Sequence, residues 1–491
     1  MKRKQFYITT TIPYVNADPH IGFALEITQA DVLARFNKLT GKNIFFNAGT
    51  DEHGLKIYRK ALDQGKKPQA YVDEYAAKFD RLKKALNLSY NNFIRTTDTH
   101  HKEAAQEFWL RCQKNGDIYK DKQKIKYCVG CELEKTDSEL NQGQCPLHSS
   151  LKIEIIEEEN YFFRFSKYQK PLLDYYKQNP NFVVPKFRFK EITKFVEKGL
   201  KDFSISRLKN KMPWGVQVPN DSEHVMYVWF DALINYISAL GWPNNKAKFK
   251  SFWGTKENPK AIQVAGKDNL RQQTAIWQAM LMSAGLPNTK QVLIHGFITA
   301  DGQKMSKSLG NVINPFDLVK KYGTDAVRYY LLKEIHPFKD SDFSYQRFEE
   351  VYNADLANGL GNLVQRVTKL CEQAGLQGKD IKRKTSSSAQ LFSQDVSYHI
   401  EKFEFNQALE LIWKYISKLD KWIERERPWE NSASEKKLIL GKIIQGTESC
   451  GSLLEIAYLL KPFLPETAQK IEKIFTAQKI TAPKKPLFPR I

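Results

Sequence analysis

The chain has 491 residues, of which 42% are hydrophobic and 27% charged, a balance typical of a soluble globular protein of about three domains. It contains no run of about 18 apolar residues, so no membrane-spanning helix is expected, and its basic N-terminus lacks the apolar stretch of a secretory signal. The net charge of +21 favours a polyanionic partner. The alternative is that this charge reflects only a lysine-rich composition.

The first predicted elements are a strand, a turn and a helix. Residues 6–12 form a β-type run, and residues 13–19 are rich in Pro, Asn and Asp. One face of the following helix collects apolar residues, namely Ile21, Leu25, Val32, Phe36 and Leu39. His20 and Gly22 therefore lie where helix amides favour an anion, and Gly22 leaves room for a flat ligand. A capping or packed histidine is the alternative for His20.

A second predicted strand, residues 43–48, completes a βαβ unit. Such units are right-handed with parallel strands, and ligands bind beyond the carboxyl ends of those strands. Asp51 follows this strand, where its carboxylate is suited to hold an ammonium group. The alternative is that Asp51 caps a helix beginning near Glu52.

Three of the six cysteines cluster with a histidine in the pattern C-x2-C-x13-C-x2-H, formed by Cys128, Cys131, Cys145 and His148. Four such ligands fill a tetrahedral zinc site completely, which predicts a structural metal, and this cysteine usage suits a reducing cytoplasm. Unligated cysteines in a small loop domain are the alternative. The remaining cysteines are expected in the core.

An aromatic segment, residues 227–236, comes next. Four of its apolar residues recur at i, i+3, i+4 and i+7, which predicts one helical face formed by Trp229, Ala232, Leu233 and Tyr236. By pattern alone, such a face belongs to a core more often than to a pocket.

A second βαβ unit is predicted downstream. It consists of a strand at residues 261–265, a turn at 266–268, a helix from 269 to about 283 and a strand at 292–295. Asp268 lies at the turn, where a carboxylate binds ribose hydroxyls or caps a helix.

Two lysines lie three residues apart in the segment that follows. Lys304 and Lys307 are flanked by Gly302 and Gly310, with two serines beside them. Two ammonium groups and hydroxyl donors on a mobile backbone suit a triphosphate whose leaving group gains charge. A solvated basic turn is the alternative. From about residue 348, Ala, Leu, Glu and Lys dominate, which predicts an all-α bundle with stops at 375–378, 427–428 and 461–462.

The two phosphate-type segments together resemble the signatures of class I aminoacyl-tRNA synthetases. Residues 20–23 match His-Ile-Gly-His in three of four positions, and residues 304–308 match Lys-Met-Ser-Lys-Ser in all five. Further matches point to the methionyl-tRNA synthetases, from about Tyr7 to residues 486–490. The resemblance implies an α/β fold: a split, Rossmann-like, doubly wound parallel sheet with an inserted zinc-knuckle domain, then an all-α bundle.

The predicted domain boundaries follow this scheme. Residues 1–115 and 226–300 are the two halves of the catalytic domain, and residues 116–225 are the insertion. Residues 301–347 form the lysine loop and a connector, and residues 348–491 form the anticodon-binding bundle.

The resemblance implies an AMP-forming ligase that joins methionine to tRNA(Met) using ATP and Mg²⁺. It implies a cytoplasmic monomer with one zinc ion. The ATP-binding residues implied by the family's motifs are His20, Gly22, Gly266, Asp268, Lys304 and Lys307, with His20 and the two lysines on the phosphates. The implied methionine-binding residues are Ile12, Tyr14, Asp51, Trp229, Ala232, Leu233, Tyr236, Asn269 and Gln273. Those implied to read the anticodon are Asn362, Arg366 and Trp429.

The sequence departs from the family at three of these places. Phe23 replaces the second histidine of the nucleotide motif, and Asn269 and Gln273 replace an isoleucine and a histidine that face methionine. Two alternatives follow: a class I synthetase for another aliphatic amino acid, and a catalytically silent tRNA-binding protein.

Overall fold

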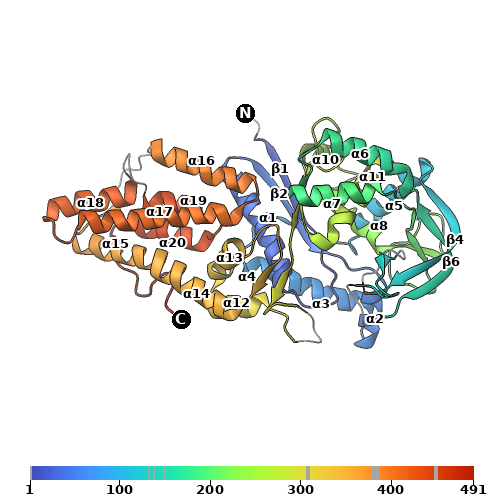
Figure 1. Ribbon diagram of the computed structural model, residues 1–491, viewed down its shortest axis with the longest axis horizontal. Helices are drawn as coiled ribbons and strands as arrows, with labels where there is room; N and C mark the ends of the chain where they lie inside the picture. The colour runs from blue at the N-terminus through green and yellow to red at the C-terminus, as the bar shows by residue number, and fades with distance from the viewer. Residues whose placement is uncertain are drawn as a thin grey trace. The chain divides into compact units, whose positions relative to one another are not determined.

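The computed structural model in Figure 1 describes residues 3–130, 133–135, 139–146, 151–305, 310–378, 387–446 and 452–491. The chain forms two compact units. The first comprises Met1–Pro19, Gly41–Arg81 and Tyr90–Ile294, and the second comprises His20–Thr40, Leu82–Ser89 and His295–Ile491. Within the described ranges, no helix combines the length and the apolarity needed to cross a membrane.

The first unit is built on a six-stranded sheet in the order β3-β2-β1-β11-β12-β7. The strands are β1 (Gln5–Thr10), β2 (Asn43–Thr50), β3 (Asn92–Arg95), β7 (Val183–Val184), β11 (Ile262–Gly266) and β12 (Gln291–His295). β1 is central, because Ile8 pairs in parallel with Phe46 on one side and with Ile262 on the other. The expected parallel sheet is confirmed, and its apolar runs are buried as such strands require.

Helices and a large apolar core complete this sheet. They are α2 (Leu55–Asp63), α3 (Pro68–Asp80), α5 (Thr99–Lys114), α6 (Gln169–Gln178), α7 (Lys186–Glu197), α10 (Lys246–Phe252) and α11 (Trp277–Ser283). Trp109, Trp253 and Trp277 are fully buried in one hydrophobic cluster of this unit. Large aromatic side chains remove much apolar area from water, so they anchor the packing around the sheet.

The segment predicted as an insertion folds mainly as an antiparallel sheet in the order β5-β4-β6-β8. Its long strands β4 (Ile118–Cys128) and β6 (Glu154–Phe163), conspicuous in Figure 1, pair along their length; β5 (Leu133–Glu134) and β8 (Phe203–Ser204) are short. A separate pair joins β9 (Ser206–Leu208) to β10 (His224–Met226). β7 also comes from this segment, yet it pairs with β12 in the main sheet.

The aromatic segment forms two short helices instead of the single predicted one. α8 spans Val228–Ala232 and α9 spans Asn235–Ser238. The Asn235 side chain donates to the Ala232 carbonyl at 2.7 Å, and a continuous helix would need that carbonyl for the amide of Tyr236. The predicted single face is therefore wrong in its geometry, although Ala232, Leu233 and Tyr236 are buried as an apolar face should be.

The predicted helix after β11 is also irregular. A 3-10 turn at Lys267–Asn269 is followed by a π-helical turn at Gln272–Ile276 before α11 begins. The Gln278 side chain donates to the Gln273 carbonyl at 2.9 Å, and the Thr274 hydroxyl donates to the Leu270 carbonyl at 2.6 Å. Side chains that take helix carbonyls in this way favour a widened turn, and such turns are frequent at functional sites.

The second unit is largely helical, as the sequence predicted for its C-terminal part. It begins with α1 (Ile21–Leu39) and α4 (Leu82–Ala85), followed by α12 (Pro315–Tyr322) and α13 (Thr324–Lys333). Its C-terminal helices are α14 (Tyr345–Val351), the π-helical η5 (Tyr352–Gly361), α15 (Asn362–Gln373), α16 (Ser387–Glu401), α17 (Phe405–Glu426), α18 (Ala433–Gln445), α19 (Leu453–Leu460) and α20 (Pro465–Phe475). Figure 1 shows α15, α17, α18 and α20 running alongside one another.

The second unit also contains a three-stranded sheet and a buried ion pair between two of its helices. The sheet joins β13 (Ile298–Ala300), β14 (Gln303–Lys304) and β15 (Ser341–Phe343). Arg328 of α13 is fully buried and pairs with Asp31 of α1 at 2.7 Å. Burial tends to raise the pKa of Asp31, but Arg328 and Arg35 outweigh it and hold that pKa below its usual range. Arg328 also donates to the Phe463 carbonyl at 2.7 Å, so one side chain connects α1, α13 and the loop between α19 and α20.

Candidate functional site

His20 is the N-cap of α1 in the second unit. Its Nδ1 accepts a hydrogen bond from the backbone N–H of Gly22 at 3.1 Å. The capping alternative for His20 is therefore what the local geometry adopts. Since Nδ1 accepts, the neutral ring carries its proton on Nε2, which is left as a donor.

Gly22 has a different local role from the one predicted. A Cβ built at Gly22 would lie 2.9 Å from Cε1 of His20 and 3.0 Å from its Nδ1. The space beside the glycine is thus filled by the histidine ring and not by open room for a flat ligand. Phe23, at the position of the missing histidine, is buried with 9% of its surface exposed.

Lys304 is exposed at the end of β14, which pairs with β13 through Thr299. The Asn311 side chain donates to the Lys304 carbonyl at 3.3 Å. Lys307, the second lysine of the predicted pair, lies outside the described residues. The described part of the segment therefore forms a short β-hairpin, and its Lys304 is exposed to solvent.

In the first unit, three of the residues implied for methionine meet beyond the ends of β1 and β2. Tyr14 and Asp51 form a parallel β-bridge, in which the Asp51 amide donates to the Pro13 carbonyl at 3.0 Å. The rings of Tyr14 and Trp229 meet edge to face, with centroids 6.3 Å apart. Asp51 is 3% exposed, so a buried carboxyl residue is bridged through its backbone to Tyr14, whose ring contacts Trp229.

Asp51 does not cap a helix, which corrects the alternative considered for it. α2 begins only at Leu55, and its N-cap residue is Gly54. Similarly, Asp268 lies inside the 3-10 turn after Gly266 and is not its cap. Gly266 ends β11 next to the central strand, and Asp268 and Asn269 follow it near the surface.

Some of the remaining residues implied for methionine are apolar and at least partly buried, and others are linked to one another by side-chain hydrogen bonds. Ala232 and Leu233 are buried, and Ile12 is half-buried. The Gln273 side chain donates to the Tyr236 hydroxyl at 2.6 Å and accepts from Gln263 at 3.3 Å. Buried polar groups need such partners, so Gln273 is held in place from two sides.

The described part of the predicted zinc site contains two of its four ligands. Cys128 ends β4, Cys145 lies between β5 and β6, and both residues are fully buried. Cys131 and His148 lie outside the described residues, and no metal-binding group of three or more His, Cys, Asp or Glu is found within them. Two buried thiols in this segment are compatible with the predicted Cys₃His donor set.

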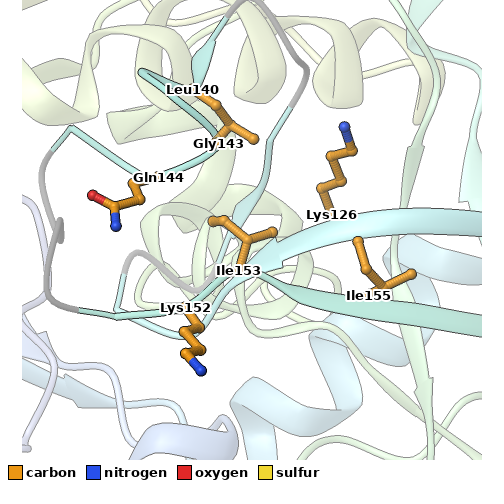
Figure 2. Close-up of a pocket in the computed structure, with 7 residues that line it drawn as sticks. All are labelled: Lys126, Leu140, Gly143, Gln144, Lys152, Ile153 and Ile155. Atoms are coloured by element: carbon orange, nitrogen blue, oxygen red, sulfur yellow. The ribbon is translucent and has the colours of Figure 1, made fainter.

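A shallow pocket lies beside this knuckle, between the ends of β4 and β6. Figure 2 shows the residues that line it, namely Lys126, Leu140, Gly143, Gln144, Lys152, Ile153 and Ile155. Its charged side chains are both lysines, so it offers no paired acid and base, and no reaction is assigned to it.

The three residues implied for anticodon reading belong to the helical part of the second unit. Asn362 begins α15 and is exposed, and Arg366 lies one turn later. Arg366 forms ion pairs with Asp420 at 2.5 Å and with Glu424, both on α17. Trp429 follows the end of α17 and keeps 42% of its surface exposed.

Sequence reasoning missed a set of buried polar residues around Asp51. Glu52 is fully buried and forms an ion pair with Arg95, with Nε to Oε1 at 2.6 Å. His53 Nδ1 lies 2.7 Å from the Asp231 carboxylate, and both side chains are at least 98% buried, with exposures of 2% and 0%. Burial raises the pKa of Asp231 above its usual range, and the adjoining His53 opposes that rise. The only signal for this pair in the sequence is that His53 lies close to Asp51 and Asp231 lies close to Trp229.

Comparisons with known proteins give a consistent result. A model of the class I tRNA synthetases, type M, matches residues 6–154 and 148–368. The methionine–tRNA ligase of Thermosynechococcus vestitus is 43% identical, covering 95% of this chain and 89% of that protein. That of Thermotoga maritima is 42% identical, covering 95% and 74%. The solved Mycobacterium tuberculosis methionyl-tRNA synthetase in complex with methionyl-adenylate is 33% identical, covers 99% and 100%, and superposes with a TM-score of 0.88.

Proposed function

Because the chain belongs to the methionine–tRNA ligase family of class I tRNA synthetases, we propose the following course for its reaction. The methionine carboxylate attacks the α-phosphorus of ATP, which gives methionyl-adenylate and releases pyrophosphate. A ribose hydroxyl of the terminal adenosine of tRNA(Met) then takes the methionyl group and AMP leaves. No side chain has to act as a nucleophile, since positioning and charge stabilisation suffice.

The observation that carries this proposal is the cluster of Tyr14, Asp51 and Trp229. A buried carboxylate suits the ammonium group of an amino acid, and an aromatic wall suits a thioether. We therefore assign the substrate amine to Asp51, and the side chain to a wall formed by Ile12, Trp229, Ala232, Leu233, Tyr236, Asn269 and Gln273.

The ATP phosphates are assigned to His20, Lys304 and Lys307. The Nε2–H of His20 can donate to a phosphate oxygen, the positive end of the α1 dipole favours phosphate charge, and the lysines stabilise charge on the departing pyrophosphate. Gly22 keeps the His20 ring in its capping position, and Gly266 and Asp268 are assigned to the nucleoside. Mg²⁺ accompanies ATP and neutralises part of the phosphate charge.

Methionine-dependent exchange of pyrophosphate into ATP tests the activation step. Full-length protein should catalyse this exchange with methionine, and should do so much more weakly with leucine, isoleucine or valine. Exchange that depends on one of those amino acids instead would identify a different class I synthetase. No exchange with any amino acid, from folded protein that binds tRNA, would favour the silent binding protein.

A structural zinc ion is proposed for Cys128, Cys131, Cys145 and His148. Four protein ligands leave no open position, so the ion would hold the knuckle together and take no part in the reaction. Elemental analysis should find one zinc per chain after purification without chelators, and less than half of that in the Cys128→Ser, Cys145→Ser double variant. Protein without zinc, or zinc unchanged in the double variant, would remove this assignment.

Anticodon recognition is proposed for Asn362, Arg366 and Trp429. An exposed indole can stack on an unpaired base, and amide and guanidinium groups can bind base edges. In this structure the Arg366 guanidinium is held by two carboxylates of α17. Reading a base with Arg366 would therefore require these ion pairs to be rearranged or shared.

A further inference from the structure

The His53–Asp231 contact joins two segments that lie 178 residues apart in the sequence. His53 follows Asp51 by two residues, and Asp231 lies in α8 between Trp229 and Leu233. Both segments carry residues assigned above to methionine. His53 Nδ1 and Asp231 Oδ2 are 2.7 Å apart, so the two side chains share one hydrogen bond.

The segment around His53 is fixed on its other sides. The Asp51 amide donates to the Pro13 carbonyl at 3.0 Å, and its own carbonyl accepts from the Val15 amide at 3.2 Å. The Trp214 indole N–H donates to the Glu52 carbonyl at 2.6 Å, and the Trp214 ring meets the His53 ring at an angle of 64°. The backbone that carries the Asp51 carboxylate is therefore held in place by several hydrogen bonds.

α8 needs an external anchor more than the loop does. It has five residues, far fewer than a helix needs to be stable by itself in water. Phe230 packs its ring against Phe108 and Trp109 on one side of α8. Asp231 is the residue of α8 whose side chain is tied to the Asp51 loop, through His53.

We propose that His53 and Asp231 form a positioning pair for methionine, which sets the distance between the Asp51 carboxylate and the part of the side-chain wall that α8 carries, Trp229 and Ala232. An amino acid held at its amine and at its side chain binds well only if both sites keep the spacing of the ligand. Neither His53 nor Asp231 has to touch the substrate. This inference rests on the proposed function, because it assumes that methionine is the ligand of this cluster.

The test compares variants of the pair in methionine-dependent pyrophosphate exchange. His53→Ala and Asp231→Asn should each raise the KM for methionine about tenfold, while the KM for ATP and kcat change less than about twofold. His53→Asn keeps a donor close to the place of Nδ1, so it should recover most of the lost affinity. Equilibrium dialysis with radiolabelled methionine gives the affinity independently of turnover.

The chain offers a control in a second His–Asp pair of the same unit, in which the histidine is buried and the aspartate is partly buried. His224 Nδ1 lies 3.0 Å from the Asp221 carboxylate, and the exposed fractions of the two side chains are 4% and 12%. This pair connects no residue assigned to methionine. His224→Ala should therefore lower the thermal stability, as His53→Ala does, and leave the KM for methionine unchanged within about twofold.

The variants also test whether the two residues act together. If they do, the double variant His53→Ala, Asp231→Asn should bind methionine no more weakly than the worse single variant. A merely structural pair would lower the fraction of active enzyme and hence kcat, with both KM values unchanged. That result, or an equal rise in methionine KM in His224→Ala, would overturn the inference. Absence of exchange in the unaltered protein would instead overturn the proposed function.

Discussion

At the scale of single residues, the packing of His20 over Gly22 shows why a His-x-Gly sequence opens α1. The ring caps the helix by accepting from the Gly22 amide, and it occupies the space that any Cβ would need. The sequence predicted the place of both residues, since a strand, a turn and an apolar helix frame them. It did not predict this contact, which depends on the rotamer of one side chain.

We expect Gly22→Ala to slow activation without destabilising the fold. The added methyl group would lie within 3.0 Å of the His20 ring and displace it, which should lower kcat for pyrophosphate exchange about tenfold or more. Alanine favours a helix over glycine by about 1 kcal/mol, so the thermal midpoint should stay equal or rise. Gly441→Ala in α18 is the control, because no atom lies within 4 Å of its Cβ. Full exchange activity in Gly22→Ala would show that the His20 ring need not cap α1.

At the scale of elements, the strands and helices that follow from apolar patterns were predicted from the sequence. The helix irregularities that involve hydrogen bonds between side chains and backbone carbonyls were not predicted. The central strands were predicted from their apolar runs and α1 from its apolar face, and most of their residues are buried. The break between α8 and α9 depends on Asn235, and the π-helical turn depends on Thr274 and Gln278. Such bonds compete with a helix that the apolar spacing supports, so spacing alone cannot reveal them.

The candidate site was likewise predictable only where a local sequence pattern indicated a residue. Asp51 could be predicted as a candidate because it directly follows a strand of a βαβ unit. His53 and Asp231, which contact each other, are 178 residues apart, and no local pattern connects them.

Asp31 should make the stability of the second unit depend on pH. Its pKa is held below the usual carboxyl value, because Arg328 and Arg35 outweigh the effect of burial. A group with a lowered folded-state pKa stabilises the fold above its unfolded-state pKa, near about 4, and loses this contribution as the pH falls below that value. Asp31→Asn leaves Arg328 buried without its carboxylate, which should cost about 3–5 kcal/mol at pH 7.

Urea unfolding of both proteins at pH 7 and at pH 3 measures this dependence. The difference in the free energy of unfolding between the unaltered protein and Asp31→Asn should be smaller at pH 3. An equal difference at both pH values would show that the charge of Asp31 does not stabilise the fold.

At the scale of the whole molecule, the proposed function divides the work between activation and anticodon reading. Activation needs no tRNA, so a residue that only reads the anticodon should not affect pyrophosphate exchange. Stacking of an indole on an unpaired base contributes about 1–3 kcal/mol, and each 1.4 kcal/mol changes affinity about tenfold. Trp429→Ala should therefore raise the KM for tRNA(Met) about tenfold or more and leave exchange unchanged.

Leu438→Ala is the matched control for this prediction. Leu438 is also an exposed apolar residue of the helical region, with 61% of its surface exposed, and it is not assigned to RNA. Its variant should aminoacylate tRNA(Met) normally. Equal losses of exchange and of aminoacylation in folded Trp429→Ala would identify Trp429 as a packing residue.

The most direct test of the account is the aminoacylation of tRNA transcripts by the full chain. The protein, supplied with ATP, Mg²⁺ and an equimolar mixture of the twenty amino acids, should attach methionine to tRNA(Met). The same transcript with its anticodon replaced by that of a valine tRNA should be charged at least about a hundredfold more slowly. Attachment of another amino acid, or no charging of tRNA(Met) by a folded protein that binds it, would contradict the assignment of this chain as a methionine–tRNA ligase.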